Sequence, residues 1–191
     1  MIERNILESA FAPALKLMKN EGLRTKVIDA LMLAVQEGGW RSLAELEAMP
    51  FTLLTETRGI NFIEHTLAVT LGAVGLARAQ VDCYRKMPYA IDMDRLVAGG
   101  ILHDVGKLLE FERKPDGTYV KSRNGMCARH PISGTIIAAK IGMPLEIINI
   151  IACHAKEGEG RPQCIETVLI HQADFGTFDP LTMLAKGSLI V

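Results

Sequence analysis

The sequence lacks an excess of charge of either sign. Its 21 Lys and Arg residues nearly balance its 22 Asp and Glu residues, and the formal net charge is -1. A near-neutral chain has no general electrostatic attraction to DNA, RNA or an anionic membrane. Any anionic ligand must therefore be bound locally. We expect the partner to be a small-molecule anionic substrate, with no nucleic acid polymer and no membrane.

Long hydrophobic runs are also absent. Charged residues interrupt every apolar stretch well short of the roughly 20 residues needed to span a bilayer. The N-terminal stretch MIERNILESAFAPALKLMKN has acidic residues early and no uninterrupted apolar segment, unlike a signal peptide. Together these features predict a cytoplasmic protein.

Cysteine is sparse, and its spacing includes no CxxC pair. The apolar surroundings of the four residues predict reduced, buried thiols with a structural role. Cys127 and His130 have CxxH spacing, but without a partner cysteine we interpret Cys127 as structural too. The four residues are Cys83, Cys127, Cys153 and Cys164.

Helical periodicity dominates what the chain does contain. With 191 residues and 49% apolar content the chain can bury one substantial core, and we expect an all-α helical bundle. Ser42 and Glu45 have the spacing of a capping box. The stretch GTYVKS predicts one short β-hairpin after the turn at Pro115-Asp116-Gly117. The expected helices cover residues 3–20 with a break at Pro13, 23–37, 42–50, a long segment from about 60, a segment from Asp92 or Asp94 through GGILHDVGKLLE, 130–140, 144–154, and 164–175 closed off by Asp179-Pro180.

We expect three parts along the chain. Residues 1–58 contain no histidine and form an N-terminal helical extension, residues 59–181 form the core, and residues 182–191 form a C-terminal tail. The apolar N-terminal helices and the apolar tail predict a homo-oligomer.

The stretch GGILHDVGKLLE, residues 99–110, places three ionisable side chains in an otherwise apolar helix-like run. Buried polar groups are costly unless something pairs with them. A metal ion is an economical partner for a His-Asp dipeptide, because imidazole and carboxylate together suit Fe, Mn and Zn. On a continuous helix His103 and Asp104 flank one cavity, and Lys107 lies a turn beyond His103 on nearly the same side.

Further histidines and one aspartate fall near the ends of other expected helices: His65, His130, His154 and Asp174. With this set the sequence resembles the HD-domain superfamily of metal-dependent phosphohydrolases, particularly its two-metal branch. ILHDVGK resembles the central HD-x-G-K motif of the family. The later family segments are matched by ARHPISGTIIA, IACHAKEGEG and IHQADF. The resemblance covers about residues 60–180.

The resemblance implies a ligand set. His65, His103, Asp104 and Asp174 would hold one metal ion, and Asp104 would bridge to a second ion held by His130 and His154. The implied cofactors are two divalent transition-metal ions, with Fe or Mn favoured over Zn, Ni, Co or Mg. A one-metal site that uses only the first four residues stays open.

The implied reaction is hydrolysis of a small phosphomonoester, nucleotide or cyclic phosphodiester. A bridging carboxylate allows two cations to lie about 3.5–4 Å apart, where both contact one hydroxide, the nucleophile. Lys107 would bind an anionic oxygen of the substrate and stabilise the negative charge that grows in the transition state.

Three other residues are weaker candidates. Glu64 and Arg129, each next to a candidate ligand, could line a substrate pocket or could be solvated. His171 falls one turn before Asp174 and could orient a metal ligand, or it could be a packed or solvent-facing histidine. Family members that hydrolyse cyclic dinucleotides carry two consecutive late histidines and a GYP signature. Here His154 stands alone and GEGRP, with Arg161, only partly matches, so a cyclic-di-GMP role is not expected.

Three other functions remain open. Mixed-valent di-iron oxygenases of this fold use the same ligand order, and ligands alone do not separate them from hydrolases. A hydrolase of a non-phosphorylated metabolite could use the same site. A non-catalytic ligand-binding module is the third alternative, although all six ligands are present.

Overall fold

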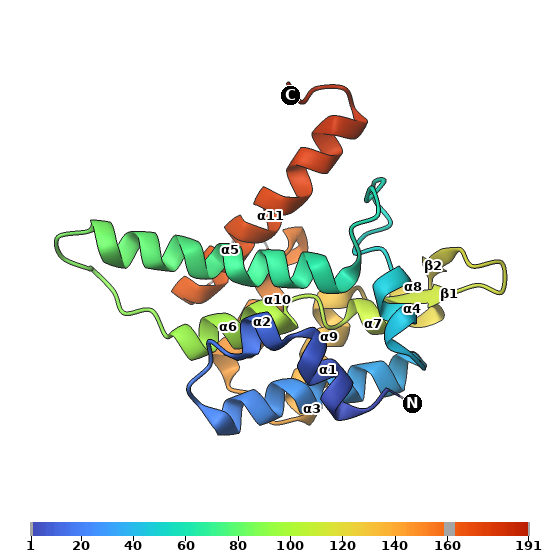
Figure 1. Ribbon diagram of the computed structural model, residues 1–191, viewed down its shortest axis with the longest axis horizontal. Coiled ribbons are helices and arrows are strands. Elements are labelled where there is room, and N and C mark those ends of the chain that lie inside the picture. Colours follow the sequence, from blue (N-terminus) through green and yellow to red (C-terminus); the bar gives the residue numbers. More distant parts are fainter. Residues whose placement is uncertain (1, 159–162, 191) are drawn as a thin grey trace.

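A computed structural model describes residues 2–158 and 163–190 and shows packed helices with one small hairpin at their edge (Figure 1). The expected all-α fold and the short hairpin are confirmed. In chain order the elements are α1 (Arg4–Ala10), α2 (Ala12–Leu15), α3 (Glu21–Gly38), α4 (Leu43–Ala48), α5 (Phe62–Cys83), α6 (Met93–Leu102), α7 (Lys107–Glu110), β1 (Phe111–Arg113), β2 (Tyr119–Lys121), α8 (Arg123–Cys127), α9 (His130–Lys140), α10 (Leu145–Cys153), the 3₁₀ turn η1 (Lys156–Gly158) and α11 (Ile165–Ala185).

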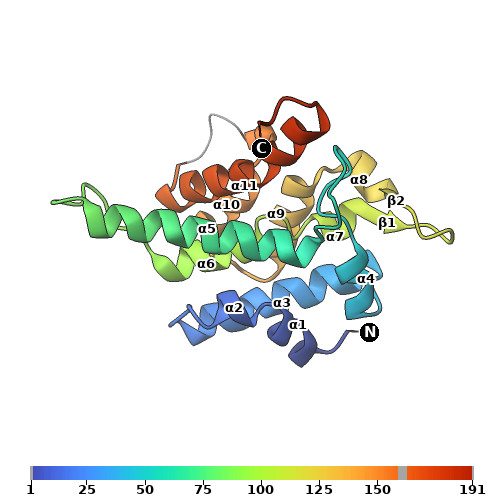
Figure 2. The same ribbon diagram turned by 45° about the horizontal axis from the view of Figure 1, so that its top comes forward.

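Helices α5 and α6 form the middle of the molecule. Figure 2 shows α1, α2 and α3 on one side of this pair, and α10 and α11 on the other. The buried residues of α5 include Val69, Ala73 and Ala77, which recur every four residues on the face toward the core. β1 and β2 pair antiparallel, with Phe111 opposite Lys121.

The N-terminal helices share one continuous hydrophobic core with the rest of the chain. Helix α3 packs on α6, α7 and α9. Buried Trp40 donates a hydrogen bond from its indole Nε1 to the carbonyl oxygen of Leu108, at 2.7 Å. The N-terminal part of the chain therefore supports α7, the short helix that follows His103 and Asp104.

Several helix boundaries follow the expected signals, with one exception at α4. The first helix is divided just before Pro13, and α3 ends at Gly39, whose φ of +78° suits glycine. The Ser42 hydroxyl accepts from the backbone N–H of Glu45, but the Glu45 carboxylate accepts from Arg41 and not from Ser42. The expected capping box is thus only half formed.

Helix α11 is longer than expected. The sequence predicted an end near Phe175, yet the helix runs through Pro180 to Ala185. Proline lacks the N–H that would bond four residues back. The helix nevertheless continues, and on either side of Pro180 the hydroxyls of Thr177 and Thr182 donate to the carbonyls of Asp174 and Asp179. The last turns rise away from the body at the top of Figure 1.

The helix expected to carry the HD dipeptide is interrupted. α6 ends at Leu102, and residues 103–106 form a turn before α7 begins. Tight bonds from Val105 N to the Leu102 carbonyl and from Lys107 N to the Asp104 carbonyl close this turn. Lys107 consequently reaches Asp104 rather than lying over His103.

The cysteines are free, as expected, but they are not buried. Cys83 and Cys127 are exposed and Cys153 and Cys164 are half-buried. Cys83 and Cys127 each end a helix, where the side chain leaves the packed face. In the part of the chain that the structure describes, no helix combines the length and the apolar character needed to cross a membrane.

Candidate metal centre

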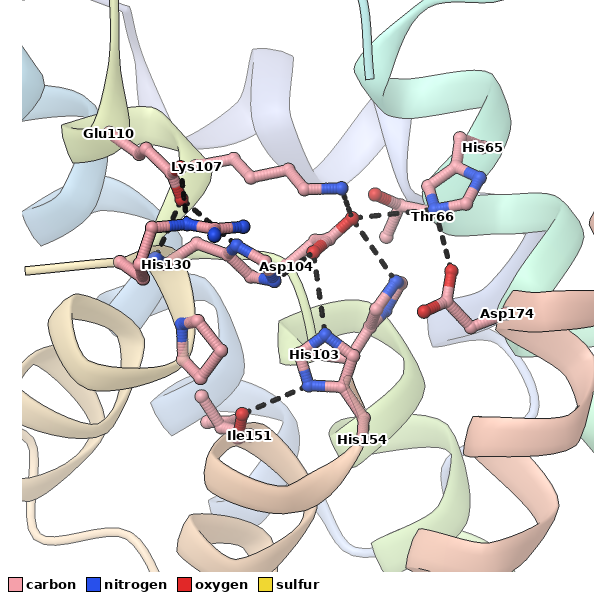
Figure 3. Close-up of polar contacts among 12 residues, drawn as sticks. His65, Thr66, His103, Asp104, Lys107, Glu110, His130, Ile151, His154 and Asp174 are labelled. Carbon is pink, nitrogen blue, oxygen red and sulfur yellow. Dashed lines mark hydrogen bonds and ion pairs between the residues drawn. The ribbon is translucent and has the colours of Figure 1, made fainter. Parts of the chain in front are cut away.

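The Asp104 carboxylate lies at the centre of a buried cluster, and only 1% of the residue is exposed. Figure 3 shows the histidine side chains arranged around it. Its Oδ2 atom lies 3.3 Å from His65 Nε2 and 3.4 Å from His103 Nε2. Asp174 joins this side of the cluster, since its Oδ1 atom is 3.2 Å from His65 Nε2.

The other carboxylate oxygen of Asp104 faces a second pair of imidazoles. Its Oδ1 atom lies 3.4 Å from His130 Nε2 and 3.5 Å from His154 Nε2. Neighbouring rings are close, with centroids 5.0 Å apart for His103 and His154 and 5.4 Å for His130 and His154. The six candidate ligands therefore meet in one place, divided between the two oxygens of Asp104.

Hydrogen bonds on the far side of each ring set its orientation. His103 Nδ1 is 2.6 Å from the Gly100 carbonyl and His154 Nδ1 is 2.9 Å from the Ile151 carbonyl. A carbonyl only accepts, so each Nδ1 carries the proton and each Nε2 directs a lone pair toward Asp104. This is the tautomer that a metal ion needs.

The donor atoms fit a divalent metal ion. Nε2 of His65, His103 and His154 and Oδ1 of Asp104 are buried and have no hydrogen-bond partner in the described part of the chain. Such groups are costly unless a partner satisfies them. Three sets of donors each lie within 4.8 Å of one another: His65, His103 and Asp104; His103, His154 and Asp174; and Asp104, His130 and His154.

Electrostatics keep the carboxylates ionised and His130 neutral. Burial acts to raise the pKa of Asp104, but the adjacent Lys107 ammonium and the His103 ring outweigh it and hold that pKa well below its usual range. Burial likewise opposes ionisation of Asp174, but the close contact with the His65 ring lowers its pKa to about 2. Burial lowers the pKa of His130. Ionised carboxylates and neutral imidazoles are the forms that bind metals.

Gly106 explains the glycine of the HD-x-G-K motif. A Cβ atom at this position would lie 2.0 Å from the carbonyl oxygen of His130 and 2.6 Å from the backbone N of Gly134. The start of α9 can therefore approach the turn after Asp104 only because no side chain intervenes. This close approach brings His130 to Asp104.

A cleft of about 370 Å³ opens onto the cluster. Asp174 and His130 lie in its wall, together with the cationic side chains of Lys107, Lys121, Arg129 and Lys156. Phe51 stacks on the His65 ring at 4.1 Å, and Phe178 contacts Phe51 edge-on at 6.4 Å. The other apolar lining residues are Leu53, Leu54, Phe111, Ala155 and Phe175.

The three weaker candidates for the site, Arg129, His171 and Glu64, lie in different surroundings. Arg129 lines the cleft, and its Nε donates to Glu110 Oε1 at 2.9 Å. His171 Nδ1 lies 2.6 Å from the backbone carbonyl of His154, so it touches the chain at a candidate ligand but not the ligand's ring. Glu64 is exposed and does not reach the cleft, because its carboxylate completes a capping box at Asn61. Arg161 and most of GEGRP lie outside the described residues.

Sequence reasoning missed several residues around the centre. Glu110 belongs to GGILHDVGKLLE, but it was not singled out because a single acidic residue after the motif carries no pattern. Phe51 precedes the matched region altogether. The Thr177 hydroxyl lies 3.4 Å from His65 Nδ1, in a segment that was expected to follow the last helix.

Comparisons with known proteins agree with the motif-based resemblance. The HD domain family model matches residues 62–175, and the chain belongs to the HD-domain superfamily of metal-dependent phosphohydrolases. This stretch contains all six candidate ligands, from His65 to Asp174.

Among curated proteins, the chain is 30% identical over 161 residues to the dihydroneopterin 2',3'-cyclic phosphate phosphodiesterase of Methanocaldococcus jannaschii. That alignment covers 82% of this chain and 63% of the relative. The chain is 32% identical over 116 residues to Ribonuclease Y of Pseudothermotoga lettingae, covering 61% of this chain and 18% of that protein. This chain thus spans less than two thirds of the length of the Methanocaldococcus jannaschii relative. No solved structure gives a significant match.

Proposed function

We propose that the protein is a metal-dependent phosphohydrolase that acts on a small phosphodiester. One observation carries the proposal: four imidazole Nε2 atoms converge in two pairs on the two oxygens of the single buried carboxylate of Asp104. Such an arrangement suits two divalent ions that share a carboxylate bridge.

Each half of the cluster holds one ion in this proposal. The ligands of the first are His65, His103, Asp104 and Asp174, and those of the second are Asp104, His130 and His154. Iron or manganese suits this mixture of imidazole and carboxylate donors. When bound, divalent ions supply Lewis acidity and make hydroxide available near neutral pH.

Lys107 is the group that binds substrate charge. Its residue is only 9% exposed, and its ammonium contacts Asp104 and lies 5.6 Å from the centroid of the Phe51 ring, in the wall of the cleft. A partly desolvated cation at this place binds a phosphoryl oxygen and stabilises the additional negative charge of the transition state. Asp104 keeps the ammonium beside the ligands.

The cleft favours a small substrate with an apolar or ring-shaped body. Its volume of about 370 Å³ lies within the range of small-molecule pockets. Phe51, Phe175 and Phe178 supply faces and edges for a ring. The name of the archaeal relative, a phosphodiesterase of a cyclic phosphate, supports a cyclic phosphodiester as the substrate class.

Two finer proposals concern the cellular setting. We place the protein in the cytoplasm. We also expect it to form a homo-oligomer, since α11 carries exposed apolar side chains near its C-terminal end, Met183 and Leu184.

The decisive test combines metal analysis with a substrate panel. Protein purified without oxygen is analysed for bound ions, loaded with Mn²⁺ or Fe²⁺, and incubated with phosphomonoesters, 2',3'-cyclic nucleotides, a linear dinucleotide and short RNA. We expect two ions per chain and the fastest cleavage with the cyclic phosphodiesters. Preference for RNA would overturn the substrate assignment, and loaded protein that is inert toward the whole panel would overturn the proposed activity.

A matched pair of variants gives the control. Asp174→Asn removes a candidate ligand from α11, whereas Asp179→Asn makes the same change at an exposed position of the same helix. We expect the first to lower metal content and activity and the second to change neither. Running the panel with and without oxygen separates hydrolysis from oxygenase chemistry, because only the latter consumes oxygen.

A further inference from the structure

Glu110 is a buried carboxylate that the proposed mechanism does not use. Only 2% of the residue is exposed, although it ends α7 next to the cleft. Its Oε2 atom accepts hydrogen bonds from the backbone N of His130 at 2.6 Å and from His130 Nδ1 at 2.9 Å. Its Oε1 atom accepts from Arg129 Nε at 2.9 Å and lies 3.8 Å from Lys121 Nζ.

This contact distinguishes His130 from the other candidate metal ligands. His103 and His154 donate from Nδ1 to backbone carbonyls, and the Nδ1 of His65 lies near a hydroxyl. Among these four rings only His130 has a carboxylate behind it. A carboxylate makes the stronger, charge-assisted bond and increases the electron density that the ring offers to an ion.

The position of Glu110 is itself fixed by close packing. Its backbone carbonyl accepts from Ser122 N at 2.8 Å, and a Cβ atom on Gly125 of α8 would lie 2.3 Å from the same oxygen. Through its carbonyl and its carboxylate together, Glu110 therefore links α7, the hairpin and the start of α9. It determines where both His130 and Arg129 point.

We propose that Glu110 is the positioning residue for the ion on the Oδ1 side of Asp104. It fixes the proton of His130 on Nδ1, directs the Nε2 lone pair toward Asp104, and anchors Arg129 in the wall of the cleft. This inference rests on the proposed function, since it assumes that an ion binds between Asp104, His130 and His154. It makes the two ions unequal, because only one of them depends on Glu110.

The test is a Mn²⁺ titration of metal-free protein, with free Mn²⁺ measured by electron paramagnetic resonance. For Glu110→Gln we expect the Kd of one ion to rise about 10- to 100-fold, the usual cost of losing a group behind a ligand. The Kd of the other ion stays unchanged. Glu112→Gln makes the same change two residues away, where the carboxylate is exposed and pairs with Lys114, and it leaves both affinities unchanged.

Two further variants show that the effect passes through His130. In a His130→Ala background, Glu110→Gln causes no additional loss of Mn²⁺ affinity, because the two changes then remove the same contact. Arg129→Gln removes the hydrogen bond to Oε1 of Glu110 and leaves both Mn²⁺ affinities as they are. Should Glu110→Gln fail to fold, Glu110→Asp keeps the charge but withdraws it by one methylene, and it gives an intermediate loss at the same ion.

The outcomes separate this inference from the proposed function. One outcome is that the wild-type protein binds two ions and the folded Glu110 variants bind both equally weakly, or both as tightly as the wild type. That outcome overturns the role of Glu110 and leaves the proposed function intact. Weakening of the same size in Glu112→Gln also overturns that role. A wild-type protein that binds one ion or none overturns the two-ion proposal and this inference together.

Discussion

The two sides of the Asp104 carboxylate are built differently. On the Oδ2 side, His65 lies in the first turn of α5 and Asp174 lies in the middle of α11, helices of 22 and 21 residues that pack along each other. On the Oδ1 side, His130 is the first residue of α9 and His154 follows the last residue of α10. Long packed helices place the first pair, whereas the second pair depends on local contacts at helix ends.

This difference shows that one donor chemistry can be supported in two ways. A residue that is part of a long packed helix, as His65 and Asp174 are, is held by that helix, whereas residues at the ends of short helices fray more readily. The Oδ1 side compensates with the Glu110 carboxylate and with the close approach at Gly106. We therefore expect the Oδ2 side to tolerate remote changes better.

Asp104→Ala should have the largest effect, since Asp104 is the only residue that both sides share. We expect loss of both ions and of at least about 4 kcal/mol of transition-state stabilisation, which is about 10³-fold in kcat/KM. Elemental analysis and hydrolysis rates measure the two losses. Retention of either ion would show that the sides are independent.

Lys107→Ala should rank second and should act on neither ion. Removing one preorganised donor to a developing negative charge costs about 10²- to 10³-fold in kcat. Metal content should remain at the wild-type value, as elemental analysis of the purified variant would show. A variant that loses metal together with activity would instead place Lys107 among the supports of Asp104.

Gly106→Ala should disturb the Oδ1 side alone. The added methyl group overlaps the His130 carbonyl, and overpacking of this kind costs about 1–3 kcal/mol. We expect a lower melting temperature and weaker binding of one ion. Gly75→Ala is the matched control, because a Cβ there meets nothing within 4 Å and alanine favours the helix. Equal weakening of both ions would contradict the comparison.

Thr177→Val should have the smallest effect. Its hydroxyl lies 3.4 Å from His65 Nδ1, a long contact on the side that the long helices already hold. We expect no more than about 1 kcal/mol, or about 5-fold, in the affinity of one ion. Thr177→Ser keeps the hydroxyl and should match the wild-type protein. A loss as large as that of Glu110→Gln would remove the asymmetry.

The sequence predicted the helices well where the local signals are strong. The Pro13 break, the end of α3 at Gly39 and the span of α9 follow directly from proline, glycine and periodicity. The predicted end of α11 was wrong because proline was taken to end the helix, whereas α11 continues through Pro180 to Ala185. The sequence did not predict the turn at residues 103–106. These residues are compatible with a helix, and only their packing against other segments interrupts the helix there.

The site was predicted through its titratable residues and not through their supports. The order of the histidines, the His-Asp dipeptide and Asp174 along the chain forms a pattern that matches a family. The supporting residues have no sequence pattern of their own. They are Phe51 in a loop, Glu110 behind the His130 ring, and Gly106 against the His130 carbonyl. Their roles depend on distances between segments that are far apart in the chain, as for Phe51 and His65.

The ring of Phe51 has a practical consequence for anyone who shortens the gene. A fragment limited to the family match, residues 62–175, would keep every candidate ligand. It would lack Phe51, which stacks on the His65 ring, and Trp40, whose indole donates to the Leu108 carbonyl. Water would then reach a face of the ring that is dry in the intact chain. The cleft of such a fragment would be more hydrated and less tightly packed than the cleft of the intact chain.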